Sequence, residues 1–195
     1  MMQLATKNDK SRVIRIFQEA FIDNPHILYL LGNKRLKRKI AIMTRHVIRV
    51  AIKRGGIYFS EDREGVLVVF EASKLQLTFI EKCSQYWMAL RCFAWRRLPA
   101  ISRTEKQVQL LRTCQPHDLY VWFYAVSDKA LGGPAARELM KDLFSLADRQ
   151  NASIYAETSL SRNVLIYERF GFECYHQKDF DGFDLYHLRK QPTKD

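Results

Sequence analysis

The sequence predicts a mixed α+β fold, with a central mixed β-sheet flanked by helices and a βαβ unit in its second half. The chain has 195 residues, of which 47% are hydrophobic and 27% are charged, the balance of a globular protein with a packed core. Between residues 119 and 158 a strand-type segment, a helix-type segment and a second strand-type segment follow one another. We expect a single domain over residues 1–195, without repeats or a low-complexity linker.

The chain opens with a strand and a helix. Residues 2–5 are a short apolar run, and Thr6 and Asp9 have the spacing of residues that cap the start of a helix. The apolar positions of this helix fall on one face and are Val13, Ile16, Phe17, Ala20 and Phe21. We expect the helix to end at residues 23–25, because Asn and Pro disfavour its continuation.

A second helix and a hairpin follow. The helix is predicted over residues 34–53, and its inward positions are Leu36, Ile40, Met43, Val47 and Val50. Residues 57–60 and 66–70 are rich in β-branched and aromatic side chains and are joined by a polar turn. This pattern predicts a β-hairpin.

The stretch from residue 73 to residue 97 is rich in large apolar side chains at mostly helical spacing. We predict a helix that Pro99 ends, and a shorter helix that begins at Ser102, because Ser102 and Glu105 have capping-box spacing. Packing in the core is the default for such apolar residues. The alternative is that some of the aromatic ones line a pocket for a substrate with an apolar or aromatic body, namely Tyr86, Trp87, Phe93 and Trp95.

The second half alternates strands and helices. The predicted elements are a strand at residues 119–126, a helix at 134–150, a strand at 153–158, a helix at 162–170, and strands at 172–175 and 183–188. The helix over residues 134–150 has as its inward positions Leu139, Met140, Leu143 and Ala147. The last two strands are expected to meet around a turn at Asp181 and Gly182.

Charge narrows the classes of partner. The formal net charge is +11, from 32 Lys and Arg against 21 Asp and Glu, so the surface attracts anions. Nucleic-acid contact by the basic side chains of the helix over residues 34–53 is one interpretation, but no RNA or DNA motif accompanies them, and we expect a solvated surface helix. The polar start and the short apolar runs predict neither a signal peptide nor a membrane partner, and hence a cytoplasmic location.

Two features bear on ligands. The four cysteines form no CxxC pair and have no His cluster beside them, so we expect no metal site.

The segment SDKALGGPAA at residues 127–136 is a Gly-containing loop that opens a helix, where free N–H groups and the helix dipole suit a phosphate or pyrophosphate. An ordinary βα turn explains the same loop. Basic residues near it that could meet phosphates are Lys129, Arg137, Lys141, Arg162 and Arg169.

The segment AETSLSRN at residues 156–163 and the string NVLIYERFGF at residues 163–172 resemble the acetyl-CoA-binding end of GNAT acyltransferases, and the puromycin-type members above all. The resemblance runs from about residue 120 to residue 172. It implies a GNAT-like domain with a substrate-side half, residues 1–115, that carries a helical insertion, and an acetyl-CoA-binding half, residues 116–195. The implied cofactor-binding residues are Ala125, Val126, Leu131, Gly132, Gly133, Ala135, Ala136, Asn163 and Tyr167.

The resemblance also implies an activity, the transfer of an acetyl group from acetyl-CoA to a primary amine of a small molecule, by direct attack. Tyr167 would be the general acid, because a phenol beside the sulfur can protonate the leaving thiolate. Asn163 and Tyr167 are four residues apart and project from the same helix face. Glu157 is either a general base or a strand-end carboxylate bonded to nearby backbone. Formation of a homodimer is left as an open alternative.

The pyrophosphate loop departs from the family pattern. Leu131 stands where Gln or Arg is usual, and Pro134 stands where Gly is usual. Proline removes one N–H donor, although its fixed φ suits the first turn of a helix. The alternative function is therefore a non-catalytic acyl-CoA-binding or regulatory module with a degenerate loop.

Overall fold

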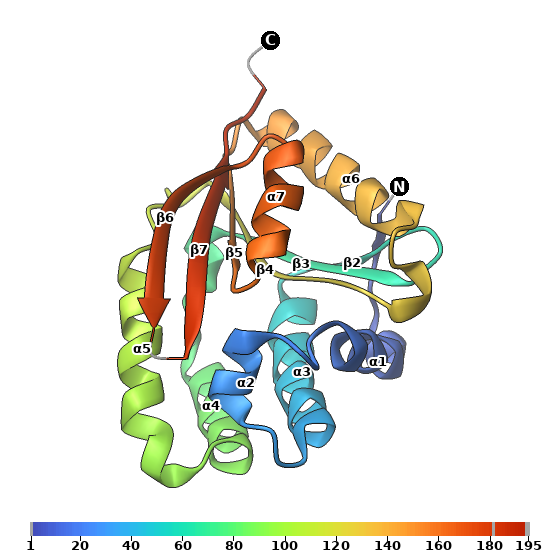
Figure 1. Cartoon of the computed structure of the whole chain (residues 1–195). Coiled ribbons are helices and arrows are strands. Elements are labelled where there is room, and N and C mark those ends of the chain that lie inside the picture. Colours follow the sequence, from blue (N-terminus) through green and yellow to red (C-terminus); the bar gives the residue numbers. More distant parts are fainter. Residues whose placement is uncertain (1, 181, 194–195) are drawn as a thin grey trace.

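A computed structural model describes residues 2–180 and 182–193, and their strands form one seven-stranded mixed sheet (Figure 1). The strands are β1 (Gln3–Leu4), β2 (Ile57–Phe59), β3 (Gly65–Glu71), β4 (Leu119–Val126), β5 (Ile154–Thr158), β6 (Glu173–Phe180) and β7 (Phe183–Lys190). Their order is β1-β2-β3-β4-β5-β7-β6, and β4 and β5 are parallel while the other neighbours are antiparallel. The predicted mixed sheet is confirmed.

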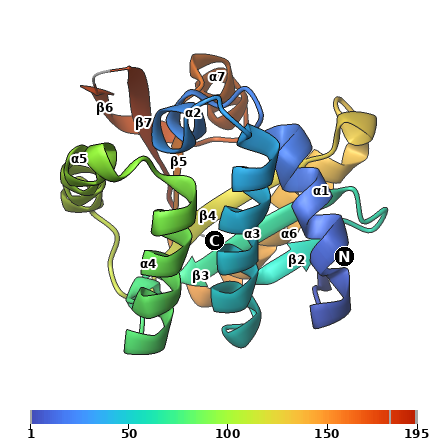
Figure 2. The ribbon, with the colours of Figure 1, turned by 90° about the horizontal axis from the view of Figure 1, so that it is seen from below.

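Helices cover both faces of the sheet (Figures 1 and 2). They are α1 (Lys10–Ala20), α2 (Pro25–Leu31), α3 (Leu36–Lys53), α4 (Phe79–Cys92), α5 (Leu98–Leu110), α6 (Pro134–Gln150) and α7 (Ser161–Arg169), with short 3-10 turns η1 (Lys7–Asp9), η2 (Ala72–Leu75), η3 (Trp95–Arg97) and η4 (Asp128–Ala130). Helices α6 and α7 cover one face, and α1 and α3 cover the other. In the part of the chain that the structure describes, no helix combines the length and apolarity that a bilayer crossing requires.

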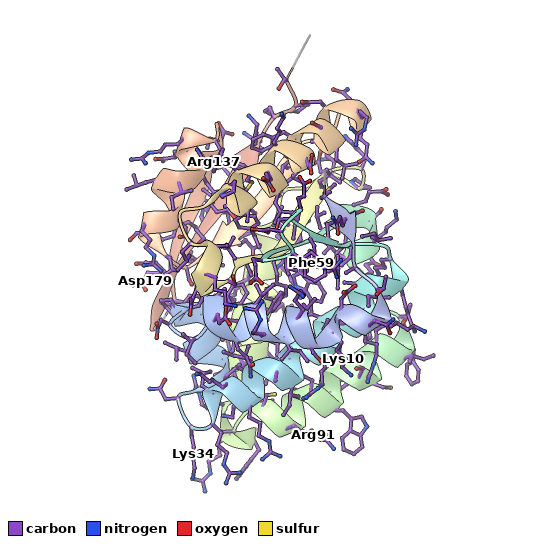
Figure 3. All side chains as sticks on the ribbon, turned by 90° about the vertical axis from the view of Figure 1, so that its right-hand side faces the viewer. Lys10, Lys34, Phe59, Arg91, Arg137 and Asp179 are labelled. Atoms are coloured by element: carbon purple, nitrogen blue, oxygen red, sulfur yellow. The ribbon has the colours of Figure 1, made fainter. Side chains whose placement is uncertain are left out.

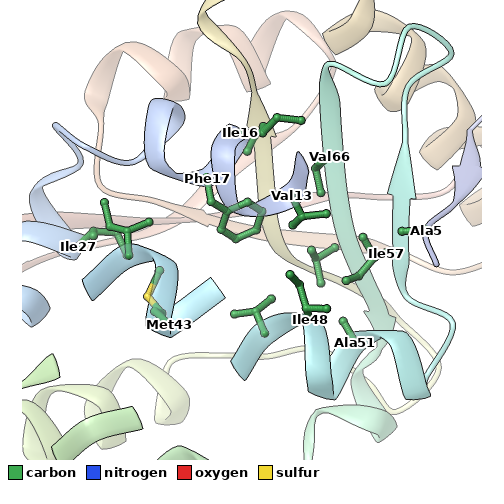
Figure 4. Close-up of a cluster of buried hydrophobic side chains, with 14 of the residues drawn as sticks. Ala5, Val13, Ile16, Phe17, Ile27, Met43, Ile48, Ala51, Ile57 and Val66 are labelled. Atoms are coloured by element: carbon green, nitrogen blue, oxygen red, sulfur yellow. The ribbon is translucent and has the colours of Figure 1, made fainter. Parts of the chain in front are cut away.

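Strand β3 shows why two cores form. Its side chains alternate between the faces of the sheet, so Val66 and Val68 join the core under α1 and α3, whereas Leu67 and Val69 join the core under α6. All four are buried. Figure 3 shows Phe59 of β2 inside the molecule, and Figure 4 shows part of the first core. Full burial of one such side chain stabilises the fold by about 1.5–3 kcal/mol.

The helical periods predicted from the sequence are confirmed for α3 and α6, whose nine predicted inward side chains are all buried. Three of the five expected inward positions of α1 are buried too, namely Val13, Ile16 and Phe17. The Thr6 and Asp9 cap is also present, since the Thr6 N–H donates to Asp9 Oδ2 at 2.8 Å. Strand β4 and helix α6 begin and end at the predicted residues.

Helix α2 was not predicted. The Asn-Pro pair was interpreted only as the end of α1, which in fact ends at Ala20. Pro25 instead opens α2, and Asn24 is its N-cap, accepting a hydrogen bond from the Ile27 N–H at 3.0 Å. Proline is well tolerated there because the first N–H groups of a helix have no intrahelical acceptor.

The predicted boundary between the next two helices was wrong. Helix α4 begins with a capping box of Thr78 and Glu81 and ends at Cys92. Pro99 does not end a helix but lies in the first turn of α5, which begins at Leu98, so Ser102 is inside α5 and caps nothing. The same tolerance of proline in a first turn explains the error.

Core packing was also the wrong expectation for most of the aromatic stretch. Tyr86, Trp87 and Trp95 are exposed, whereas the buried residues of α4 are Glu81 and Cys92. Helix α4 packs against α3 (Figure 2).

The closing strands form the expected antiparallel pair. Strand β6 continues to Phe180, five residues beyond the predicted end at residue 175. Of the expected turn, Asp181 lies outside the described residues, while Gly182 has a φ of +109°, a conformation that glycine adopts readily.

Candidate functional site

Strands β4 and β5 separate part of the way along the sheet. Their parallel pairing covers Leu119 to Val121 on β4 and stops at the pair of Val121 and Ala156. Beyond that point β4 pairs only with β3, up to Val126. The edge of β4 that faces β5 therefore offers backbone N–H and C=O groups without sheet partners, which can pair with an extended ligand.

A cavity of about 1690 Å³ extends from this opening. It is bounded on one side by β4, the loop after it and α7, and on the other by α2, α4 and α5. The predicted site residues that line it are Ala125, Val126, Leu131, Gly132, Gly133, Ala136, Glu157, Asn163 and Tyr167. Ala135 is completely buried and does not line the cavity.

The loop after β4 leads directly into the N-terminus of α6. Gly132 has a φ of +75°, which glycine adopts without strain, and the Gly133 N–H donates to the Ala130 oxygen at 3.0 Å. No side chain caps α6, and Pro134 is its first residue. The amides of Ala135 and Ala136 are in the first turn, where helical N–H groups have no intrahelical acceptor. Such an end suits an anion.

Three of the five basic residues expected near the loop line the cavity, namely Arg137, Arg162 and Arg169. Lys129 and Lys141 do not line it. The cavity wall therefore includes an uncapped helix end, Arg137 of the same helix, and two further guanidinium groups on α7, a set that fits the phosphates of a nucleotide-type ligand.

Tyr167 lies on α7 at the cavity wall. It is 7% exposed, and its ring packs edge-on against Phe172 at 5.0 Å between centroids. Burial raises the pKa of the Tyr167 hydroxyl well above its ordinary value of 10.0, so the phenol keeps its proton at neutral pH. A proton donor with an apolar setting thus borders the cavity.

Asn163 lies one turn before Tyr167 on the same helix face. Its Nδ2 donates to the Thr158 hydroxyl at 3.2 Å, which ties α7 to the end of β5. The side chains of both Asn163 and Tyr167 line the cavity, as the four-residue spacing predicted.

Glu157 is not free in the cavity, because it forms a bidentate ion pair. Arg112 donates from Nε to Oε1 at 2.7 Å and from Nη2 to Oε2 at 3.2 Å. Burial by itself raises the pKa of Glu157, but the Arg112 guanidinium outweighs it, and the pKa lies below its ordinary value of 4.5. The guanidinium also stacks over the Tyr120 ring at 4.6 Å. Glu157 is therefore a fixed carboxylate at neutral pH.

His187 lies behind this pair. It is completely buried, and its Nδ1 is 3.5 Å from Glu157 Oε1. Neither ring nitrogen makes a hydrogen bond to any residue that the structure describes. Burial lowers the pKa of His187, while the Glu157 carboxylate opposes the shift.

The opposite side of the cavity holds a second polar pair and several rings. His26 Nε2 is 3.0 Å from Glu105 Oε1, and both residues line the cavity. Trp122 and Phe123 of β4 line it as well. Among the four aromatic residues proposed for a substrate pocket, Tyr86 and Phe93 line the cavity and Trp87 and Trp95 do not.

No sequence motif predicts a role for Arg112, Tyr120, His26 or His187. Arg112 is 45 positions from Glu157, and His26 is 79 positions from Glu105. No local motif marks such pairs, because strand order and helix packing bring them together. Among the described residues, no three His, Cys, Asp or Glu side chains converge in a way that could hold a metal ion.

Comparison with known proteins gives two kinds of likeness. No family model matches the sequence. An uncharacterised N-acetyltransferase of Schizosaccharomyces pombe is 25% identical over 183 residues, which cover 84% of this chain and 70% of that protein.

Solved structures match nearly the whole chain. A histone acetyltransferase HPA2 and related acetyltransferase from Corynebacterium glutamicum superposes with a TM-score of 0.68 at 16% identity, covering 100% of this chain and 97% of that one. Arylalkylamine N-acetyltransferase 2 from Aedes aegypti has a TM-score of 0.67 at 14% identity, with 99% of each chain covered. The chain is thus similar in sequence to an N-acetyltransferase and similar in fold to acetyltransferases of the GNAT type.

Proposed function

We propose that the protein transfers an acetyl group from acetyl-CoA to a primary amine of a small molecule. The observation that carries this proposal is the position of Tyr167, a buried phenol that stays protonated at neutral pH and borders the cavity at the opening between β4 and β5. The likeness in sequence and fold, together with the names of the matched proteins, supports the same activity.

The residues around the opening fit the donor. The free edge of β4 near Ala125 and Val126 suits the amides of a pantetheine arm, which has the reach and hydrogen-bonding pattern of an extended chain. Gly132 and the first turn of α6 would hold the diphosphate, with Gly133 shaping the loop through its bond to Ala130 and with Arg137 and Arg162 adding charge-assisted contacts. Pro134 costs one N–H donor but leaves the uncapped amides of Ala135 and Ala136.

Bound acetyl-CoA supplies a thioester, whose carbonyl carbon forms the new C–N bond while its C–S bond breaks. We assign to the Tyr167 hydroxyl the donation of its proton to the departing sulfur. A general acid of this kind contributes about 10²–10⁴-fold to a rate. No Cys nucleophile is needed, because the acceptor attacks directly.

Glu157 is the proposed acceptor of the proton that the amine loses, directly or through a water molecule. Its ion pair with Arg112 keeps the carboxylate ionised and fixed in orientation.

The cavity wall on the side where the acceptor would bind suits an amine with an apolar body. Trp122, Phe123 and Phe93 contribute rings to the cavity wall, and Glu105 with His26 adds a polar end. Binding sites of this composition fix the polar group of a ligand and bury the remainder.

A non-catalytic acyl-CoA-binding role is less favoured, because the named relatives are acetyltransferases and a protonated Tyr167 borders the cavity. The experiment that decides combines calorimetric binding of acetyl-CoA with thiol release on a panel of aliphatic and arylalkyl amines. We expect binding, and turnover with at least one amine.

Tyr167→Phe is the matched variant. It keeps the ring that packs on Phe172, so acetyl-CoA affinity should stay the same while kcat falls about 100-fold or more. Binding without turnover on the whole panel would favour the non-catalytic role. Equal kcat in the variant would remove Tyr167 as the acid, and absence of acetyl-CoA binding would contradict both roles.

A further inference from the structure

Helix α4 and the turn after it expose an apolar stripe, which we call the α4 face. It consists of Phe79, Ile80, Tyr86, Trp87, Leu90 and Trp95, which are 64–80% exposed. Monomeric soluble proteins rarely leave large apolar side chains together on their surface unless the patch binds something. The α4 face therefore requires an explanation that core packing does not provide.

The side chains of α4 are arranged as in an amphipathic helix whose apolar side faces outward. At 3.6 residues per turn the five α4 members of the face fall within an arc of roughly 120°. On the same wheel Lys82 and Arg91 flank this arc, one on each side. Glu81 and Cys92 point the other way and are buried. An apolar stripe between basic flanks is typical of helices that lie on membrane surfaces.

The arginines of this region lie against its indole rings. The Arg91 guanidinium is 5.9 Å from the Trp87 ring centroid, and that of Arg96 is 5.2 Å from the Trp95 centroid. Trp, with its apolar body and polar N–H, and Arg, with its long apolar stem, are both suited to the boundary between lipid headgroups and acyl chains.

The segment between β3 and β4 is strongly basic as a whole. Over residues 72–115 its basic members are Lys74, Lys82, Arg91, Arg96, Arg97, Arg103, Lys106 and Arg112, and its acidic members are Glu81 and Glu105. Both acids have partners, Glu81 with Arg54 at 2.7 Å and Glu105 with His26 at 3.0 Å. Two of the basic side chains are also paired, Arg112 with Glu157 and Lys74 with Glu71, and the other six still outnumber the two acids. The charge that this segment offers to a partner is therefore positive.

A second basic segment adjoins the α4 face. Arg97 stacks over Tyr29 of α2 at 5.1 Å, which brings η3 beside the connection between α2 and α3. That connection exposes Lys34 and Arg35. In Figure 3, Lys34 and Arg91 both lie along the lower edge of the molecule. The positive charge thus extends around this end of the protein.

We propose that the α4 face docks on an anionic lipid surface, with its apolar side chains in the interface and its basic flanks on the headgroups. Ile80, Leu90 and Phe79 gain free energy from an apolar phase and little from phosphates, so lipid fits better than nucleic acid. A second copy fits less well, because a two-fold contact through this stripe brings like-charged flanks together. This inference departs from the sequence-based expectation of no membrane partner.

The docking surface shares a wall with the cavity. Tyr86 and Leu90 belong to the α4 face and also line the cavity. A protein held by this face would therefore present one cavity wall to the bilayer. The proposal itself does not depend on acetyl transfer, because it rests only on the exposed residues of α4, η3 and the α2–α3 connection.

The test is vesicle flotation of the full chain with phosphatidylcholine vesicles and with vesicles that also contain phosphatidylglycerol. We expect binding only to the anionic vesicles, weakened by high salt. Emission from the tryptophans should shift to the blue on binding. Replacement of both Trp87 and Trp95 by Ser should weaken binding about tenfold or more and abolish that shift.

Matched controls separate the face from general effects of composition. Leu165→Ser removes an apolar side chain that is 60% exposed on α7 and should leave vesicle binding unchanged. Arg91→Glu should weaken binding by at least about fivefold, whereas Arg149→Glu on α6 changes the net charge equally and should have little effect. Circular dichroism and the thermal midpoint check that every variant is folded.

Three results would overturn the proposal. The first is no binding to anionic vesicles by the wild-type protein. The second is binding that the Trp87 and Trp95 double variant retains in full. The third is a dimer, seen by analytical ultracentrifugation, that the double variant dissociates and that does not bind vesicles, since this would assign the face to a second copy.

Discussion

The part of the molecule from β4 to β7 and the segment between β3 and β4 use apolar residues in opposite ways. Helix α6 turns its apolar face inward, where Leu139, Met140 and Leu143 are almost fully buried, and leaves its N-terminal amides at the cavity. Helix α4 is equally helical, yet its large apolar side chains face solvent and its packed side contains Glu81. Apolar periodicity thus identifies a helix in both places, but it identifies the buried face in only one.

The difference has a topological cause. Helix α6 connects two neighbouring parallel strands and must cross the face of the sheet, so one side of it is necessarily covered. Helix α4 lies in the segment that connects the antiparallel neighbours β3 and β4. It packs on α3 at the margin of the core. Only the connection between β4 and β5 therefore requires its helix to bury an apolar face.

The largest effect that tests this comparison is on stability. Leu143→Ala in α6 should lower the free energy of unfolding by about 3 kcal/mol, because the side chain is fully buried and a cavity remains. Leu90→Ala in α4 makes the same chemical change at a side chain that is 64% exposed, and should cost less than about 0.5 kcal/mol. Urea unfolding measures both, and equal losses would break the comparison.

A smaller effect is expected in the pH dependence of stability. Burial lowers the pKa of His187 on β7 and that of His46 on α3 beside α4, in each case below the ordinary value of 6.5. Around His187 the carboxylate of Glu157 opposes the shift, whereas His176 and Arg112 reinforce it. Around His46, Arg49 reinforces the shift and Glu81 opposes it.

The sign follows from proton linkage. Below pH 6.5 the unfolded chain binds protons that the folded histidines do not yet accept, so the free energy of unfolding falls as the pH falls, by up to about 1.4 kcal/mol per pH unit for each histidine. His187→Gln and His46→Gln should each flatten this dependence between about pH 7 and pH 5.5. Urea midpoints at several pH values measure it, and an unchanged slope in either variant contradicts the assignment for that histidine.

The smallest effect concerns the loop before α6. A Cβ at Gly132 would meet no atom within 4 Å, so Gly132→Ala tests backbone conformation alone. Because φ is +75°, the variant should lose roughly 1–2 kcal/mol, seen as weaker acetyl-CoA binding or lower stability. Ala100→Gly, at an exposed position of α5, should leave acetyl-CoA affinity unchanged. Calorimetric titration compares the two, and equal affinity and stability of Gly132→Ala and wild type would show that the loop tolerates another conformation.

Prediction from sequence succeeded where a local sequence pattern was compatible with only one secondary structure. Strand β4 and helix α6 were placed correctly, because apolar periods were bounded by turn residues and by Pro134. It failed where the same pattern was compatible with two structures. Pro25 and Pro99 can follow a helix or open one, and both open one here.

For the candidate site, the motif NVLIYERFGF located Asn163 and Tyr167, and the loop LGGPAA located the uncapped end of α6. The ion-pair partner of Glu157 could not be predicted from the sequence, because no spacing pattern links it to Arg112 across 45 positions. Sequence alone determined most of the helices and strands and the residue types at the opening between β4 and β5, since these depend on neighbours along the chain. The tertiary structure alone decided that Glu157 is paired and that the apolar side of α4 faces outward, because pairing and burial depend on what packs alongside.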